Sequence, residues 1–312
     1  MEEITIQEYD IGDREECISL LESVFHNTSD EATFKWRFEA PDREKPLLIC
    51  AKTKNKVVSF NSWIPWEFTY KNKIYVGYQS GESATDINLR GQGIFSKIMN
   101  FALDIAIQKN IDFFFGFPDS MSYGPALRFG YYPVATYYFY IRPLNPFKKI
   151  RYKENCNKYN NYPSMMLIEH DKITPIVNDE YWKWRYENNP KHYDIIEYVE
   201  DNSRAVFYLR KKMWKYLSEM ILLDCQFSNY NEIFLEHAFK YLFSLYARKA
   251  FYIRTFFNKN TERGRFLNSY FPIRVKSRNC KFMVKNISGR IDSKEILNLN
   301  QWEIMPHCVD DL

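Results

Sequence analysis

Glycine is scarce in this sequence, with 10 residues in 312, so a stretch that contains it twice stands out. The six cysteines form no CxxC pair, and the five histidines form no pair at helical spacing. These absences exclude the common zinc patterns and predict neither a metal site nor a disulfide framework. Cysteines scattered in this way are typical of a reducing compartment, and we expect a cytoplasmic protein.

Long hydrophobic runs and a strong net charge are also lacking. No segment approaches the roughly 20 apolar residues of a membrane span, and the polar start MEEITIQEYD is unlike a signal peptide. The net charge of +4 is too small to indicate nucleic acid as a partner. A hydrophobic fraction of 46% and a charged fraction of 26% are typical of a globular protein, here long enough for two domains.

A six-residue motif occurs twice, about half the chain apart. The first copy, FKWRFE, covers residues 34–39 and is followed by Pro41; the second, WKWRYE, covers residues 182–187 and is followed by Pro190. Both copies predict a helix end that is stopped by proline. After each copy the hydrophobic pattern predicts three strands and then a long helix. The predicted strands are 46–52, 57–64 and 73–83, then 193–199, 204–210 and 219–227, and the helices are 93–109 and 231–248.

Two diverged copies of one α+β unit explain the length better than one large domain. We therefore predict a first domain over residues 1–145 and a second over residues 163–312, joined by a linker at 146–162. The basic residues of the linker could attract an anionic ligand, but a solvated connection is the simpler interpretation.

The stretch with two glycines is RGQGIF, residues 90–95, between a predicted strand and an amphipathic helix. A helix N-terminus presents unpaired N–H groups and a partial positive charge, which favour anions. Gly91 and Gly93 would let a pyrophosphate approach the backbone, and Arg90 and Lys97 add positive charge. The third glycine of GxGxxG and the lysine of a P-loop are both missing, so neither of these phosphate motifs is present.

Residues 90–95 resemble the R/Q-x-x-G-x-G/A acetyl-CoA loop of the GNAT acetyltransferase superfamily, with Phe95 where the family has Gly or Ala. The segment from Asp119 to Tyr131 resembles a second GNAT motif, N-x-x-A-x-x-L-Y-x-K-x-G-F, and Gly130-Tyr131 matches its end. The resemblance implies an α+β fold with two tandem GNAT-like domains, each a mixed, mostly antiparallel twisted sheet flanked by helices. It also implies that loop amides bind the pyrophosphate of acetyl-CoA, the acyl donor. The implied cofactor-binding residues are Ser83, Ala84, Thr85, Arg90, Gly91, Gln92, Gly93, Ile94, Phe95, Ser96, Lys97 and Asp119.

Acetyl transfer to an amine needs a polarised carbonyl, a base for the amine and an acid for the leaving thiolate. The resemblance implies a carboxylate base on the fourth strand, where Glu82 stands, although a solvent-facing glutamate is an equal alternative. The position of the tyrosine that often acts as the acid in this family is taken by Ala126 here. Tyr123 is the nearest candidate for the acid, although it could also be an ordinary aromatic residue in a chain rich in them. Asp119 could bind the amine or cap the next helix, and capping is the simpler interpretation. In one group of tandem GNAT proteins, the C-terminal carboxylate of the chain itself reaches the active site. Nothing in this sequence requires that role of Leu312.

The sequence therefore predicts an acetyl-CoA-dependent N-acetyltransferase that acts on a primary amine of a small molecule such as an amino sugar. Two alternatives stay open: a FemX-like aminoacyl transferase, which the intact Gly91 and Gly93 disfavour, and a non-catalytic acyl-CoA-binding sensor. The second copy has no glycine at its turn, NYNEIFLEHAF, and we expect no pyrophosphate site there. We expect no metal, nucleic acid or membrane partner, and a homodimer is compatible with the sequence.

Overall fold

The computed structural model describes residues 3–26, 30–41, 43–54, 56–145, 147, 167, 169–214 and 217–309. The chain forms two compact units, and each draws on both halves of the sequence. Unit 1 comprises Met1–Ala135, Pro175–Pro190 and Lys281–Asn298, and unit 2 comprises Thr136–Thr174, Lys191–Cys280 and Leu299–Leu312. These units differ from the predicted domain ranges because three segments are exchanged between the halves. Apart from Phe147, the predicted linker lies outside the described residues.

The sheet of unit 1 runs in the order β1-β2-β3-β4-β5-β12. The β4–β5 pair is parallel and the other pairs are antiparallel. The last strand reaches this unit from the far end of the sequence, where residues 283–286 of β12 pair with β5. The strands are β1 (Thr5–Glu8), β2 (Leu47–Lys52), β3 (Val57–Tyr70), β4 (Lys73–Thr85), β5 (Phe113–Gly116) and β12 (Ile273–Asn286).

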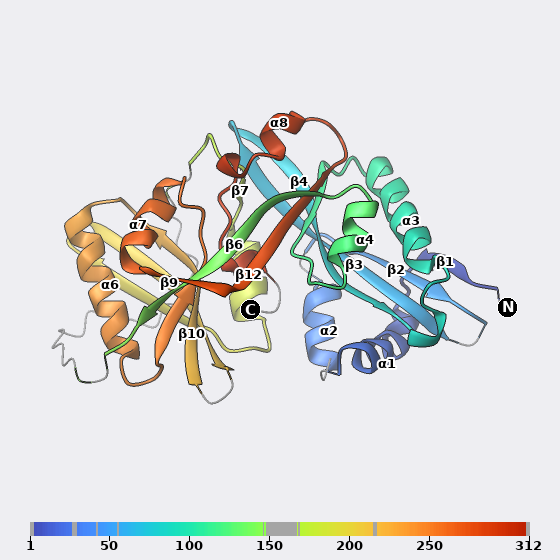
Figure 1. Ribbon diagram of the computed structural model, residues 1–312, viewed down its shortest axis with the longest axis horizontal. Coiled ribbons are helices and arrows are strands. Elements are labelled where there is room, and N and C mark those ends of the chain that lie inside the picture. Colours follow the sequence, from blue (N-terminus) through green and yellow to red (C-terminus); the bar gives the residue numbers. More distant parts are fainter. Residues whose placement is uncertain are drawn as a thin grey trace. The chain divides into compact units, whose positions relative to one another are not determined.

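Helices cover both faces of this sheet (Figure 1). On one face, α3 buries Ile98 and Ala102 in a core that also contains Trp63 and Phe114 of the strands. On the other face, Phe34 of α2 packs on the ring of Phe60 in β3. The helices of unit 1 are α1 (Arg14–Phe25), α2 (Glu31–Phe38), α3 (Ile94–Gln108), α4 (Tyr123–Arg128), α5 (Asp179–Trp182) and α8 (Ser293–Ile296), with the π-helical turn η3 at Lys183–Glu187 and 3-10 turns η1 (Ile11–Asp13) and η2 (Ile87–Leu89).

The two copies of the repeated motif pack against each other within unit 1. The indoles of Trp36 and Trp184, 148 residues apart, stack with centroids 5.1 Å apart and planes at 12°. Each indole Nε1 donates a hydrogen bond to the other tryptophan's carbonyl oxygen, at 2.6 and 2.9 Å. Reciprocal hydrogen bonds of this kind relate the two tryptophans by a local two-fold axis. A groove of about 710 Å³ lies beside the stack, and part of its lining comes from equivalent positions of the two segments: Ala32 and Glu180, Lys35 and Lys183, Trp36 and Trp184, Ala40 and Asn188.

Unit 2 repeats the strand pattern of unit 1, in the order β6-β11-β10-β9-β8. Its central pair, β10 with β11, is parallel, and the flanking pairs are antiparallel. The apolar stripe of α6, which includes Phe234, Ala238 and Leu242, belongs to the core of this unit. Its elements are β6 (Tyr132–Pro143), β8 (Asp194–Glu200), β9 (Ser203–Trp214), β10 (Leu217–Phe227), β11 (Tyr252–Thr255), α6 (Glu232–Tyr246), α7 (Glu262–Tyr270), η4 (Leu299–Gln301) and η5 (Pro306–Cys308), and the short strand β7 (Thr174–Pro175) spans the boundary with unit 1.

The predicted fold class, a mixed and mostly antiparallel sheet flanked by helices, is confirmed. The predicted helices 93–109 and 231–248 are α3 (Ile94–Gln108) and α6 (Glu232–Tyr246), within two residues at each end. Within the ranges that the structure describes, none of the helices has the length and apolar character needed to cross a membrane.

Substitution of Gly264 by alanine is expected to destabilise unit 2 strongly. A Cβ atom at this position of α7 would lie 1.7 Å from the carbonyl oxygen of Asn258. This oxygen belongs to the backbone, which cannot move aside as the end of a flexible side chain can. We expect the free energy of unfolding to fall by at least about 3 kcal/mol, as measured by chemical denaturation. Gly124→Ala in α4 is the matched control, because its nearest contact would be Arg128 Nη1 at 3.7 Å. Equal stabilities of the two variants would contradict the packing described here.

Candidate acyl-donor site

The parallel strands β4 and β5 separate at one point in unit 1. Their pairing covers four residues and ends at Ser80 and Gly116, whereas β4 continues to Thr85 along β3. A Cβ atom on Gly116 would lie 3.3 Å from the Cβ of Ser80, so glycine permits the close approach just before the strands part. Beyond this point residues 81–85 have no partner on β5, and their backbone groups on that edge can bind an extended ligand.

A β-bulge lies immediately after the separation. Asn61 and Trp63 of β3 pair with Ser83 and Ser80 of β4, so three steps along β4 match two along β3. The bulge therefore falls at Gly81 and Glu82.

Glu82, the predicted base, lies on this bulge and forms an ion pair. Its Oε1 accepts a hydrogen bond from Arg37 Nη1 of α2 at 2.7 Å. The Arg37 side chain is 6% exposed and that of Glu82 is 20% exposed. The carboxylate is therefore held by a buried cation and still reaches solvent, a contact that sequence reasoning missed because 45 residues separate the partners.

The glycine loop leads from the end of β4 into α3. Gly91 and Gly93 have φ values of 80° and 76°, a backbone conformation that glycine adopts without strain. A Cβ atom built at either position would meet nothing within 4 Å. Gly93 is the N-cap of α3 and no side chain caps this end, so the first N–H groups of the helix are available to an anion. The side chain of Arg90 is tied to the end of β4, with Nε donating to Thr85 O at 3.2 Å.

Of the predicted cofactor-binding residues, Thr85 is half-buried, with its Oγ1 2.8 Å from Ser59 Oγ, and seven others fall into two groups. Side chains of the first group are exposed: Ser83, Arg90, Gln92, Ser96 and Lys97. In the second group Ala84 and Ile94 are buried, so only their backbone faces the loop. The ring of Phe95 packs partly against the core beneath α3, which explains how a large residue is accommodated here. Their role in binding stays a prediction.

Asp119, the last predicted cofactor-binding residue, has the geometry of a cap. Its Oδ1 accepts hydrogen bonds from the N–H groups of Met121 and Ser122 at 2.9 and 2.8 Å and from Ser122 Oγ at 2.7 Å. Burial alone would raise the pKa of Asp119, but these hydrogen bonds outweigh it and lower the pKa. The geometry supports the capping interpretation.

Two hydroxyl groups meet at the point where the strands part. Ser80 Oγ and Tyr131 Oη are 2.6 Å apart, and burial raises the pKa of Tyr131 to about 12, so this phenol is protonated at neutral pH. The predicted acid Tyr123 lies at the start of α4, where Lys281 Nζ is 3.7 Å from the centroid of its ring. The sequence analysis did not consider Tyr131 as a candidate acid, although this residue ends the second motif.

Unit 2 contains the same separation, but the chain itself occupies it. Pairing of β10 with β11 ends at Ile221 and Arg254, and a bulge follows before Asp224. Beyond it, Arg263 Nη1 donates to Asp224 Oδ1 at 2.9 Å and to Cys225 O at 3.1 Å. The backbone edge that is open in unit 1 is thus bonded to a side chain of α7.

Residues near the end of the described chain also lie in the strand separation of unit 2. Glu303 Oε1 accepts a hydrogen bond from Arg263 Nε at 2.8 Å, and His307 Nδ1 lies 3.2 Å from Asp224 Oδ2. Asn258 Nδ2 donates to the carbonyl oxygen of Trp302 at 2.9 Å. The strand edge at this separation is therefore occupied in unit 2, and the absence of a pyrophosphate site there stays a prediction. Leu312, for which the sequence required no role, lies outside the described residues.

Comparison with known proteins agrees with this geometry. The family model described as an acetyltransferase (GNAT) domain matches residues 5–134, which include the strand separation, the glycine loop and Tyr131. No curated protein matches the sequence.

Solved structures with a similar fold have low sequence identity. A protein of Enterococcus faecalis V583, described as a probable N-acyltransferase, is 11% identical with a TM-score of 0.68, over 92% of this chain and 73% of that one. A GCN5-related N-acetyltransferase from Anabaena variabilis is 10% identical with a TM-score of 0.61, over 91% and 73%. The N-myristoyltransferase of Saccharomyces cerevisiae with bound myristoyl-CoA is 13% identical with a TM-score of 0.55, over 91% and 79%.

The cluster in unit 2 is expected to make stability depend on pH. Burial alone would lower the pKa of His307, but Cys308 and Asp224 outweigh it and raise the pKa to about 9. A histidine with a raised folded-state pKa stabilises the fold fully below its unfolded pKa of about 6.5, and this contribution disappears as the pH rises to about 9. The stability difference between the wild type and His307→Gln should therefore shrink by about 3 kcal/mol over this range. Urea denaturation at each pH measures it, and a constant difference would contradict the assignment.

Proposed function

We propose that this chain transfers an acetyl group from acetyl-CoA to a primary amine of a small molecule such as an amino sugar, since residues 5–134 match the model of the GNAT acetyltransferase domain. The observation that carries the proposal is the continuity between the open edge of β4 and the exposed glycine loop at the start of α3. The edge would bind the pantetheine amides, and the loop would bind the pyrophosphate.

Charge and space around the loop support a phosphate-bearing donor. The N-terminus of α3 carries a partial positive charge of roughly half a unit, and Arg90 and Lys97 add full charges within the same turn. The yeast N-myristoyltransferase structure contains myristoyl-CoA, so a long acyl chain is the alternative donor. The buried rings of Phe115 and Phe282, 6.4 Å apart, occupy the region beside Gly116 and favour a short acyl group.

The proposed chemistry uses groups on both sides of the bulge. The amine nitrogen attacks the thioester carbonyl carbon, the carbon–sulfur bond breaks, and the amine proton passes to Glu82 directly or through water. The leaving thiolate takes a proton from an acid, for which Tyr131 is our first choice and Tyr123 the choice from sequence. Arg37 fixes the orientation of the Glu82 carboxylate.

Two other functions remain as alternatives. A FemX-like aminoacyl transferase does not explain an open glycine loop at a helix N-terminus. A non-catalytic acyl-CoA sensor would share the loop but would show no turnover. The acceptor amine and a homodimer stay predictions.

Binding of acetyl-CoA is expected to depend on the space above the glycine loop. Gly93→Val should weaken binding at least 100-fold in calorimetric titration, because its side chain would occupy the space of the pyrophosphate. Gly289→Val is the matched control: Gly289 also has a positive φ, 70°, and open space around it, so it suffers the same backbone strain away from the loop. Equal binding by the two variants would overturn the donor site.

The acid is expected to be Tyr131. Tyr131→Phe should lower kcat by about 100-fold while leaving the Kd for acetyl-CoA unchanged, and Tyr123→Phe should change kcat less than twofold. Steady-state assays of thiol release with an amino-sugar acceptor measure both. The reverse result would return the role to Tyr123.

A further inference from the structure

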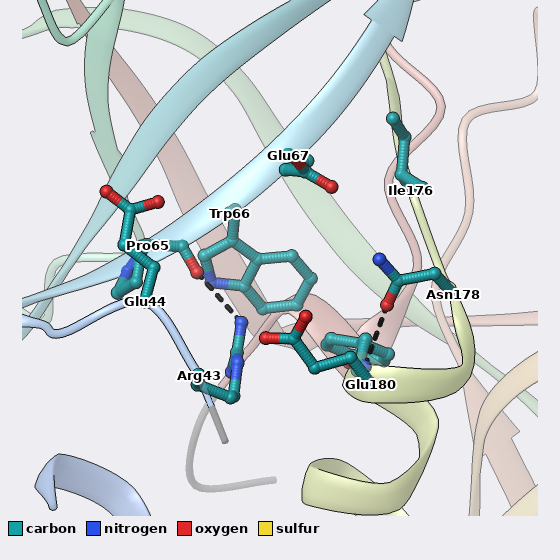
Figure 2. Close-up of a pocket in the computed structure, with 9 residues that line it drawn as sticks. Arg43, Glu44, Pro65, Trp66, Glu67, Ile176, Asn178 and Glu180 are labelled. Carbon is teal, nitrogen blue, oxygen red and sulfur yellow. Dashed lines mark hydrogen bonds between the residues drawn. The ribbon is translucent and has the colours of Figure 1, made fainter. Parts of the chain in front are cut away.

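A second cavity of unit 1 lies on the face of the sheet that α5 covers (Figure 2). Its volume is about 160 Å³. The peptide N–H of Ile176 donates to Glu67 O at 2.8 Å, which fixes the segment before α5 to β3 at this point. The lining residues are Arg43, Glu44, Pro65, Trp66, Glu67, Ile176, Asn178, Glu180 and Tyr181.

Arg43 forms one wall of the cavity and is a half-buried cation. Its Nη2 donates to the carbonyl oxygen of Pro65 at 3.0 Å, and its guanidinium carbon lies 3.9 Å from the ring centroid of Trp184. Burial lowers the pKa of Arg43. Among the residues that the structure describes, no carboxylate pairs with it within 4 Å. A guanidinium has five N–H donors, so Arg43 retains donors for an anion.

One carboxylate faces the same cavity from another side. Figure 2 shows Glu180 on α5 turned toward the space in front of the Trp66 indole. Within the described part of the chain this carboxylate forms no ion pair. Glu44 differs, since its Oε1 accepts a hydrogen bond from the Tyr78 hydroxyl at 2.9 Å.

The floor of the cavity is aromatic and apolar. The rings of Trp66 and Tyr181 lie 5.1 Å apart at 47°, and both residues are buried, at 2% and 3% exposed. Ile176 adds an aliphatic side. The cavity therefore joins one cationic wall, one anionic wall and an apolar floor.

We propose that this cavity binds a zwitterion of amino-acid size. The carboxylate of the ligand would pair with Arg43, its ammonium group with Glu180, and an aliphatic side chain would cover Trp66. A cavity of about 150 Å³ holds a benzene molecule, so a ligand of about eight heavy atoms, such as valine, is near the upper size.

This site is separate from the acyl-donor site. Trp66 pairs with Gly77 of β4, five residues before Glu82, which is about 17 Å along a strand at about 3.4 Å per residue. A small ligand here cannot reach the transfer centre. Its binding is therefore independent of the proposed acetyl transfer.

Calorimetric titration with three matched compounds tests the charge pattern. L-valine carries both charges, isobutylamine lacks the carboxylate, and isovalerate lacks the ammonium group. We expect L-valine to bind at least tenfold more tightly than either analogue and to shift the indole N–H resonance of Trp66 in NMR spectra. Equal binding of L-valine and isobutylamine, or no binding of any compound, would overturn the proposal.

Variants then locate the site. Glu180→Gln should weaken L-valine binding at least tenfold, whereas Glu44→Gln, which removes a carboxylate that bonds to Tyr78, should change it less than twofold. Gly93→Val should bind L-valine as the wild type does, which separates this site from the donor loop. Wild-type affinity in Glu180→Gln would show that L-valine binds elsewhere and would refute the assignment.

Discussion

The parting of β4 from β5 after Ser80 and Gly116 governs the arrangement of unit 1. A strand that leaves its neighbour exposes backbone N–H and C=O groups that must find other partners. The bulge at Gly81 and Glu82 increases the local twist and directs the edge away from β5. The chain then enters α3 through a turn with two left-handed glycines. An open backbone edge and an uncapped helix end thus face one region, where an extended donor with an anionic end can satisfy both.

Unit 2 meets the same constraint with its own side chains. The parallel pair β10 and β11 also parts early, and Arg263 bonds to the carbonyl oxygen of Cys225 on the exposed edge. The segment after Leu299 supplies Glu303 and His307 to the same cluster. In unit 2, side chains of the chain itself thus occupy the strand separation that is open in unit 1.

Features that depend on neighbours in sequence could be predicted. The periodicity of α3, the glycine turn before it and the strands β2 to β4 follow from local patterns. Partners distant in sequence could not be predicted, because nothing local encodes them. The pairing of β12 with β5, the contact of Arg37 with Glu82 and the pair of Ser80 with Tyr131 are of this kind.

The repeated motif is a further case in which the sequence did not reveal a contact between distant residues. The offset of 148 residues between its copies was visible in the sequence and suggested two separate domains. The structure instead places both copies in unit 1, where Trp36 and Trp184 exchange hydrogen bonds. These reciprocal hydrogen bonds hold the two copies together although they are far apart in sequence. The small cavity beside Trp66 forms because the segment just before the second copy, residues 176–181, lies against β3.

The charges at the two bulges differ in a way that fits the proposed proton transfer in unit 1. Glu82 pairs with Arg37 and its side chain is 20% exposed, so in the proposed reaction its carboxylate can take up a proton from a bound amine or from water. Asp224 is 0% exposed and lies between Arg263 and His307. Burial alone would raise the pKa of Asp224, but His307 and Arg263 outweigh it and lower the pKa. A buried carboxylate held by two cations is a poor base, whereas the carboxylate of Glu82, which is oriented by Arg37 and partly exposed, keeps its access to protons.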